Sequence, residues 1–311
     1  MLRITFSLLL ALSFSSFAIA KNILPAPQKI AAHSYAWIGP LPGPSAENQG
    51  YRMNLGFVVG NKGVVVIDTG YTEAMAKEML AHIRKVSKAP IIAAVNTNSQ
   101  PHRFFGNNVF KKAGAKIIST KKEKQRMEGS IAQYKSTIER TLKLKQGTIA
   151  SPALPDTIID KPKTINLGNV RVIIETHGAS HTPDSLVAHV IEDKVVFTGD
   201  ILYRGRLLAV LPDSNVKQWI ASFNKLKDYG EATLIPGHGQ AGLLKDFEFS
   251  TLSYLTLLQN HMTKSIDTDM ETQDAISTLN QSAYSKLVNF EQLSGRNASW
   301  AYLEAEKAAF E

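Results

Sequence analysis

The sequence predicts an α/β protein, a four-layer αβ/βα sandwich that is followed by a C-terminal helical extension. Two stretches of the chain are rich in strand-forming residues and each continues into helices, which favours two sheets packed face to face with helices outside. Prolines between residues 152 and 162 form an extended connection between these halves. We therefore expect a sandwich domain over residues 21–242 and helices over residues 243–311.

The first half has a β-β-α-β order. Residues 56–70 contain two β-rich runs around a Gly-Asn-Lys-Gly turn, which predicts a β-hairpin. A helix is expected next, because apolar residues recur at helical spacing from Met75 to Val86. The remaining elements of this half are a strand over residues 91–97, a helix end and strand over 111–119, and a longer helix over 121–145.

The second half begins with a renewed β pattern at Thr164 and ends in helices. Strands are expected over residues 170–174, 185–190, 194–198 and 232–235, with a helix over 216–228. Apolar residues at helical spacing predict two or three tail helices, near residues 244–258, 276–290 and 300–310. Such stripes are typical of core packing or of contact between two copies, so a homodimer through these helices is one prediction.

Residues 1–20 have the pattern of a secretory signal peptide. Arg3 supplies the positive start, residues 8–12 the apolar middle, and Ala18-Ile19-Ala20 a small-residue cleavage site. The apolar stretch is shorter than the roughly 20 residues of a spanning helix, so we expect no membrane span. The chain also has no cysteine for a disulfide or a lipid anchor. These features predict an exported, soluble protein, most simply one of a bacterial periplasm.

The formal net charge is +8, and much of the excess lies in residues 111–126, where Glu123 is the one acidic residue. A solvated helix face is the ordinary explanation of such a run. Contact with an anionic envelope polymer or an anionic substrate is the alternative. Export and the lack of interleaved aromatic residues argue against nucleic acid as a partner.

Four segments carry the residues that could bind a metal. Asn98-Ser99-Gln100-Pro101-His102-Arg103 follows the strand at residues 91–97. Farther along the chain come a Gly-Ala-Ser-His-Thr-Pro-Asp segment with His181, a Thr-Gly-Asp segment ending at Asp200, and a Pro-Gly-His-Gly segment with His238. In order and spacing these segments resemble those of the metallo-β-lactamase superfamily, and the first is similar to its T-H-x-H-x-D-H motif. The resemblance covers roughly residues 45–240 and implies the sandwich fold.

The resemblance also implies two adjacent metal ions, but the first motif is altered here. Asn98 and Gln100 stand at the first two imidazole positions, His102 at the aspartate position, and Arg103 at the last imidazole. Amide oxygens are weak ligands for zinc, so a normal dinuclear centre is not expected. One interpretation is a single ion, zinc or a similar metal, whose ligands are His102, His181, Asp200 and His238.

The other interpretation is a site without any ion. In it Arg103 takes the place of the metal, pairs with Asp200, and hydrogen-bonds to Asn98 or Gln100. A guanidinium is always charged and fits a carboxylate with two parallel hydrogen bonds, so it could neutralise Asp200 alone. Both interpretations remain open from the sequence.

Further residues gain roles from their places in these segments. The resemblance implies that Asp68, at the end of the hairpin, supports the metal loop and does not itself bind the ion. Asp184 follows His181 and is expected to orient that loop. Tyr203, Arg204 and Arg206 follow Asp200 and are predicted to contact substrate from a loop at the mouth of the site.

Two functions follow from these interpretations. The first is an exported metal-dependent hydrolase of an ester, amide, thioester or phosphoester, in which Asp200 holds the metal and Arg103 steadies an oxyanion. The second is a catalytically degenerate relative, a periplasmic binding or accessory protein whose cleft holds a small anionic ligand through Arg103 and Arg204. The partner is then a small-molecule substrate or an anionic ligand.

Overall fold

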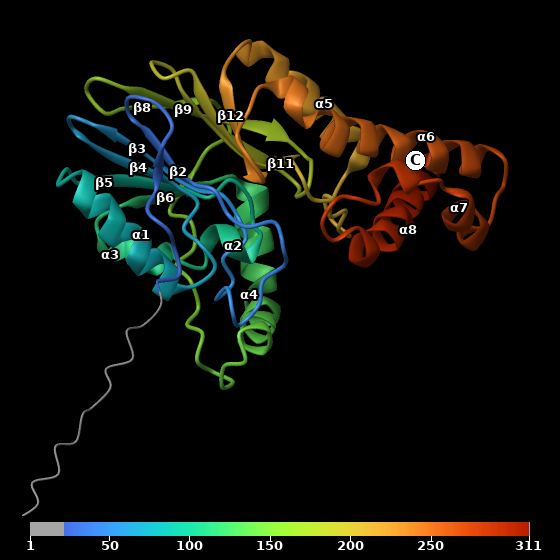
Figure 1. Cartoon of the computed structure of the whole chain (residues 1–311), viewed down its shortest axis with the longest axis horizontal. Helices are drawn as coiled ribbons and strands as arrows, with labels where there is room; N and C mark the ends of the chain where they lie inside the picture. The colour runs from blue at the N-terminus through green and yellow to red at the C-terminus, as the bar shows by residue number, and fades with distance from the viewer. Residues whose placement is uncertain (1–21, 311) are drawn as a thin grey trace, which may run out of the picture.

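The computed structural model describes residues 22–310, so the predicted signal peptide lies outside the described residues. Two sheets form the body of the protein. The first has seven strands in chain order and the second has five, in the order β12-β11-β10-β9-β8. The helices α1 and α3 and the helix α5 lie on opposite sides of the pair of sheets (Figure 1). The predicted αβ/βα sandwich is confirmed.

The first sheet is antiparallel from β1 to β4 and parallel from β4 to β7. Its strands are β1 Gln28–Lys29, β2 Ser34–Trp37, β3 Leu55–Gly60, β4 Gly63–Ile67, β5 Ile91–Val95, β6 Lys116–Ser119 and β7 Thr157–Ile158. The helices of this half are α1 Glu73–Val86, α2 Pro101–Phe104, α3 Asn107–Lys112 and α4 Lys121–Thr141. The predicted hairpin is the β3-β4 pair, and Thr72 caps α1 by accepting a hydrogen bond from the Met75 amide.

The second sheet is antiparallel except for the parallel pair β11 and β12. Its strands are β8 Lys163–Asn166, β9 Arg171–Gly178, β10 Ser185–Val190, β11 Val195–Tyr203 and β12 Thr233–His238. Helix α5, Val216–Lys225, continues into a 3-10 turn at Leu226–Tyr229. Strand β11 runs five residues beyond the predicted end at residue 198 and includes Tyr203, so the prediction of Tyr203 in a loop is wrong.

Three apolar clusters build the layers. The cluster between the sheets joins residues such as Val65 and Val95 to Leu186 and Phe197. A second cluster lies between the first sheet and the helices α1, α3 and α4, and a third between the second sheet and α5. Burial of all three faces is the main stabilising term of such a fold.

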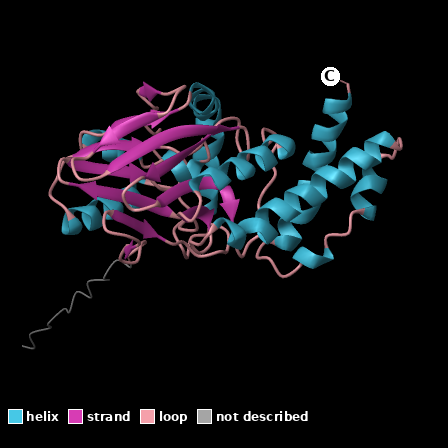
Figure 2. Cartoon of the chain, turned by 90° about the horizontal axis from the view of Figure 1, so that it is seen from above, coloured by secondary structure: helices cyan, strands magenta, loops and turns pink. Residues whose placement is uncertain are grey.

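The tail is helical, as predicted, and packs against the rest of the chain. It comprises a 3-10 turn at Leu244–Phe247, a π-helical segment at Glu248–Ser253, α6 Tyr254–Asp267, α7 Thr272–Thr278, a 3-10 turn at Ser282–Tyr284 and α8 Phe290–Ala309. These helices lie beyond α5 at one end of the molecule (Figures 1 and 2). Among residues 22–310, no helix combines the length and apolar character needed to cross a bilayer.

The tail helices share one core with the second sheet. Leu258 and Tyr302 belong to the same buried cluster as Trp219 and Leu202. The side chain of Asn297, fully buried on α8, accepts a hydrogen bond from the Val210 amide and donates one to the Leu208 carbonyl. The apolar stripes that motivated the homodimer are therefore largely covered within one chain, and the dimer stays a prediction.

The tail also pairs with the segment that follows β11. The Leu207 amide donates to the Val288 carbonyl, and the Val288 amide donates to the Gly205 carbonyl. These bonds flank Arg206, which forms a parallel bridge with Val288. The backbone around Arg206 is therefore held by the tail.

Candidate metal centre

The centre of the site is the Arg103 side chain, which α2 carries into the space between the ends of the two sheets. It is fully buried, yet each of its five N–H groups has an acceptor. Nε and Nη2 donate to the two oxygens of Asp200, at 3.1 and 2.5 Å. Nη1 donates to the Asn54 carbonyl at 2.9 Å and to Asp68 at 3.1 Å. The last bond runs from Nη2 to the Gly237 carbonyl at 3.1 Å.

Gly237 has to be a glycine at this point. A Cβ atom there would lie 2.3 Å from Asp200 Oδ1 and 2.6 Å from Arg103 Nη2. The Pro-Gly-His-Gly segment thus lets the backbone of β12 approach the buried ion pair closely.

Arg103 makes one of the contacts predicted for it, the pairing with Asp200, but not the other. It hydrogen-bonds to neither Asn98 nor Gln100, since its five N–H groups are taken by Asp200, Asp68 and two backbone carbonyls. For the same reason no N–H group is left to steady an oxyanion, so these contacts do not support the predicted catalytic role. Arg103 is a positioning residue that fixes the Asp200 carboxylate.

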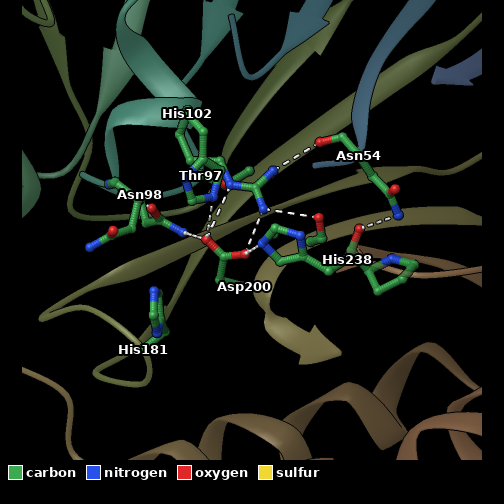
Figure 3. Close-up of polar contacts among 12 residues, drawn as sticks. Asn54, Thr97, Asn98, His102, His181, Asp200 and His238 are labelled. Carbon is green, nitrogen blue, oxygen red and sulfur yellow. Dashed lines mark hydrogen bonds and ion pairs between the residues drawn. The ribbon is translucent and has the colours of Figure 1, made fainter. Parts of the chain in front are cut away.

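Asp200 lies on β11 and is fully buried. Burial by itself would raise the pKa of this carboxyl, but the Arg103 guanidinium holds the pKa well below its usual range. Asn98 Nδ2 adds a hydrogen bond of 2.8 Å to Oδ2 (Figure 3). Asp200 is therefore an ionised carboxylate at neutral pH.

His238 is held in one tautomer by the backbone. Its Nδ1 lies 2.8 Å from the Arg52 carbonyl, which can only accept, so Nδ1 carries the proton. Burial, followed by the charge of Arg206, lowers the pKa of His238 to about 3, so the ring is neutral. Its Nε2 then presents a lone pair to Asp200 Oδ1 at 3.3 Å (Figure 3). Two acceptors facing each other at this distance repel, and a cation between them removes the repulsion.

His102, on α2, stands on the other side of the same carboxylate. Its Nε2 lies 3.4 Å from Asp200 Oδ2. Neither ring nitrogen has a well-formed hydrogen bond to any of the described residues, although both are buried. Burial and the Arg103 charge hold the pKa of His102 well below its ordinary value, so this ring is neutral too. A buried, neutral and unpartnered imidazole is available as a metal ligand.

His181 lies apart from the other predicted ligands (Figure 3). His102, Asp200 and His238 each offer a ligand atom within 4.8 Å of the others, and His181 does not join this group. Its Nδ1 is hydrogen-bonded to the Ala209 carbonyl at 2.8 Å, and its ring packs on Trp219. The structure therefore brings together three of the four predicted ligands.

The first of the two altered positions, Asn98, does not supply a ligand atom. The Asn98 side-chain oxygen accepts the Gln100 amide at 2.8 Å, which directs its NH₂ group toward Asp200. An NH₂ group cannot bind a cation. Gln100 stands at the N-cap of α2, and no side-chain hydrogen bond to the helix is formed there.

Asp68 supports the site from behind Arg103. It adopts a positive φ of 58° just after β4 and accepts hydrogen bonds from the Thr97 amide and hydroxyl. Burial raises its pKa to about 6, against the opposing effect of Arg103. Its position behind the guanidinium agrees with a supporting residue and keeps it away from the imidazoles.

Glu123, to which the sequence assigned no role at the site, joins the loop at Ser99 to the loop at Asp184. The buried Glu123 carboxylate on α4 accepts the Ser99 amide and the Asp184 amide, each at 2.7 Å. The available signal was its position as the one acidic residue of the basic run. The Asp184 side chain itself accepts a hydrogen bond from the Thr176 hydroxyl, so it fixes the end of β9 and the loop after it.

The predicted substrate contacts fall in other places. Tyr203 is buried on β11, where its ring stacks on His238 with centroids 5.1 Å apart. Arg204 donates to the Ala241 carbonyl and lies 3.7 Å from Asp246. Arg204 is thus paired within the chain, and its predicted role at the site is not supported by its contacts.

Residues 52–238 match the family described as the metallo-beta-lactamase superfamily. This span covers more than half of the chain and includes Arg103 and the three clustered residues. The chain belongs to the metallo-β-lactamase superfamily. Members of this superfamily usually bind metal, often zinc.

Two relatives and one solved structure illustrate the similarity. The chain is 26% identical over 231 residues to metallo-beta-lactamase IND-1 of Chryseobacterium indologenes, which covers 73% of this chain and 86% of the relative. It is 31% identical over 91 residues to acyl-coenzyme A thioesterase MBLAC2 of Gallus gallus, covering 28% and 32% of the two chains. A metallo-beta-lactamase from Pontibacter korlensis has the same fold, with a TM-score of 0.60 at 20% identity, and covers 74% of this chain and 98% of its own.

The donor atoms of this superfamily member fit one metal ion. Zinc with bonds of about 2.0–2.1 Å in a tetrahedron separates its ligand atoms by about 3.3–3.4 Å. His102 Nε2 lies 3.4 Å from Asp200 Oδ2, and His238 Nε2 lies 3.3 Å from the other carboxylate oxygen, Oδ1. Two neutral rings and one ionised carboxylate, with ligand atoms within 4.8 Å of one another, make His102, Asp200 and His238 suitable ligands.

Replacing Arg103 by Met should destabilise the protein strongly. The change leaves Asp68 and Asp200 buried without their shared cation, which typically costs about 3–5 kcal/mol. We expect a loss of this size in urea unfolding at pH 7. The control is Arg204→Met, whose partly exposed side chain should cost less than about 1 kcal/mol. A loss below about 1 kcal/mol for Arg103→Met would contradict the central role of this ion pair.

The buried imidazoles should make the metal-free protein sensitive to acid. Burial lowers the pKa of His181 to about 4, below the unfolded value of about 6.5. As the pH falls from about 6.5 to about 4, the unfolded chain binds protons that the folded chain does not, so stability is lost. Each such imidazole contributes at most about 1.4 kcal/mol per pH unit.

Urea unfolding between pH 4.5 and 6.5, in the presence of a chelator, measures this slope. His181→Gln should reduce the change of unfolding free energy with pH by the contribution of one imidazole. A slope equal to that of the unchanged protein would mean that His181 takes up its proton in the folded state.

Proposed function

We propose that the protein is an exported metal-dependent hydrolase with one metal ion, zinc or a similar divalent metal, at His102, Asp200 and His238. The observation that carries this proposal is the His238 ring. Its tautomer is fixed by the Arg52 carbonyl, so an imidazole lone pair faces an ionised carboxylate oxygen at 3.3 Å. A bound cation makes this contact favourable.

The chain's own residues prepare the ligands. Arg103 orients the Asp200 carboxylate with two hydrogen bonds, and the Arg52 carbonyl orients His238. Such supporting contacts fix ligand geometry and commonly change metal affinity by about 10–100-fold when lost. A zinc ion held in this way supplies a Lewis acid that polarises a carbonyl or phosphoryl oxygen. Because Arg103 shares the charge of Asp200, we expect weaker metal binding than an unshared carboxylate would give.

The substrate class follows from the superfamily. One relative is named a metallo-beta-lactamase and another an acyl-coenzyme A thioesterase. These names support a small molecule with an amide or thioester bond, and an ester or phosphoester completes the proposed range.

Metal content tests the proposal directly. The purified protein should carry one zinc, manganese or iron ion per chain after metal loading and dialysis. His102→Ala and His238→Ala should each reduce metal affinity by more than about 100-fold, beyond the loss of a supporting residue. His181→Ala is the matched control and should keep the metal, because His181 lies outside the cluster. Hydrolysis of an ester, phosphodiester or cephalosporin should require the loaded ion.

One observation favours a second function. Arg103 already binds both oxygens of Asp200 and neutralises them. A protein with this site could act without metal as a periplasmic binding or accessory protein for an anionic ligand. Absence of bound metal after loading, together with no hydrolysis of any panel substrate, would favour this alternative and contradict the first.

We also propose export to the periplasm, which rests on the pattern of residues 1–20. Expression of the full chain in a Gram-negative host should yield a periplasmic protein whose mass corresponds to a start at Lys21. A chain that keeps residues 1–20 and stays in the cytoplasmic fraction would contradict export.

A further inference from the structure

Two arginines near the site lack the partners that Arg103 has. Arg206 is only 3% exposed, and its buried Nε and Nη1 atoms have no hydrogen-bond partner. Arg52 is half-buried, and its Nε is likewise buried and unpartnered. Within residues 22–310, neither guanidinium has a carboxylate at ion-pair distance. Buried N–H groups of a charged side chain are costly to leave unpaired, so each needs an acceptor.

Both arginines are linked to His238, Arg52 through its backbone and Arg206 through its charge. The backbone carbonyl of Arg52 receives the Nδ1 proton of this ring. Arg206 follows Tyr203, whose ring stacks on His238, by three residues, and its charge acts on the His238 ring. The charges of both arginines therefore act on the proposed metal ligands, that of Arg206 on His238 and that of Arg52 on His102.

The two cations also act on each other. Burial, and then the charge of Arg52, lowers the pKa of Arg206 to about 10, so Arg206 is still charged at neutral pH. The carboxylates paired with Arg103 do not balance the charges of Arg52 and Arg206. Arg52, Arg103 and Arg206 supply three positive charges, whereas Asp68 and Asp200 supply at most two negative ones. A bound divalent metal would increase this excess.

We propose that Arg52 and Arg206 form an oxyanion site beside His238, which binds a doubly charged group of the phosphate type. A guanidinium matches phosphate and carboxylate oxygens with parallel hydrogen bonds, and two guanidinium groups whose charges act on each other favour a dianion over a monoanion. That this anion belongs to the substrate rests on the proposed function. The existence of the anion site does not depend on the proposed function.

Calorimetric titration of inorganic phosphate into the mature chain tests the site. The experiment uses chelator-treated protein at constant ionic strength, with acetate as a singly charged comparison. We expect saturable phosphate binding that is at least tenfold tighter than acetate binding. Arg52→Gln and Arg206→Gln should each weaken phosphate binding at least tenfold. Arg204→Gln is the matched control, because this neighbouring arginine is already paired, and should change binding less than twofold.

Several outcomes would overturn the inference. They are no phosphate binding by the folded protein, undiminished binding by Arg206→Gln, or acetate binding as tight as phosphate. If Arg206→Gln fails to fold, Arg206→Lys and Arg52→Gln decide, since Lys keeps the charge but loses the fork of donors and should still bind more weakly. Phosphate binding without metal or hydrolysis would leave the anion site in place and remove the proposed hydrolase. Hydrolysis without phosphate binding would remove the anion site and leave the proposed hydrolase in place.

Discussion

The site depends on one buried guanidinium. Arg103 bonds to Asn54 before β3, Asp68 after β4, Asp200 on β11 and Gly237 on β12, so a single side chain links both sheets at their ends. Lysine could not replace it, because an ammonium group has three donors and no planar fork. The geometry of Asp200, and through it the spacing to His102 and His238, follows from this side chain.

The same guanidinium reconciles the two interpretations that the sequence left open. Arg103 does pair with Asp200, but it approaches both carboxylate oxygens and leaves His102 and His238 facing the same group. Asp200 Oδ2 accepts hydrogen bonds from both Arg103 and Asn98, whereas Oδ1 accepts one from Arg103, so Oδ1 on the His238 side keeps a lone pair that a metal could use. The guanidinium and the metal would share the negative charge of Asp200, so Arg103 would weaken metal binding without excluding the metal sterically.

The fold could be read from the sequence because it depends on long apolar patterns, while much of the site could not. The residues at motif positions do converge: Arg103, Asp200, His102 and His238 come from segments far apart in the chain. The acceptors at Asn54 and Gly237 are backbone carbonyls, which no side-chain pattern encodes. The distance of His181 depends on a loop tied to Ala209, and Tyr203 was misplaced because β11 continues past the Gly-Asp turn.

The tail helices contact the candidate site through the backbone on either side of Arg206, which bonds to Val288. The region shared with the Pontibacter korlensis structure makes up 98% of that chain but 74% of this one. About a quarter of this chain therefore lies outside the shared fold. An appended segment that braces the arginine of the proposed anion site offers an evolutionary route to new ligand preferences. Mutations in the tail could retune selectivity while every residue of the inherited motif stays unchanged.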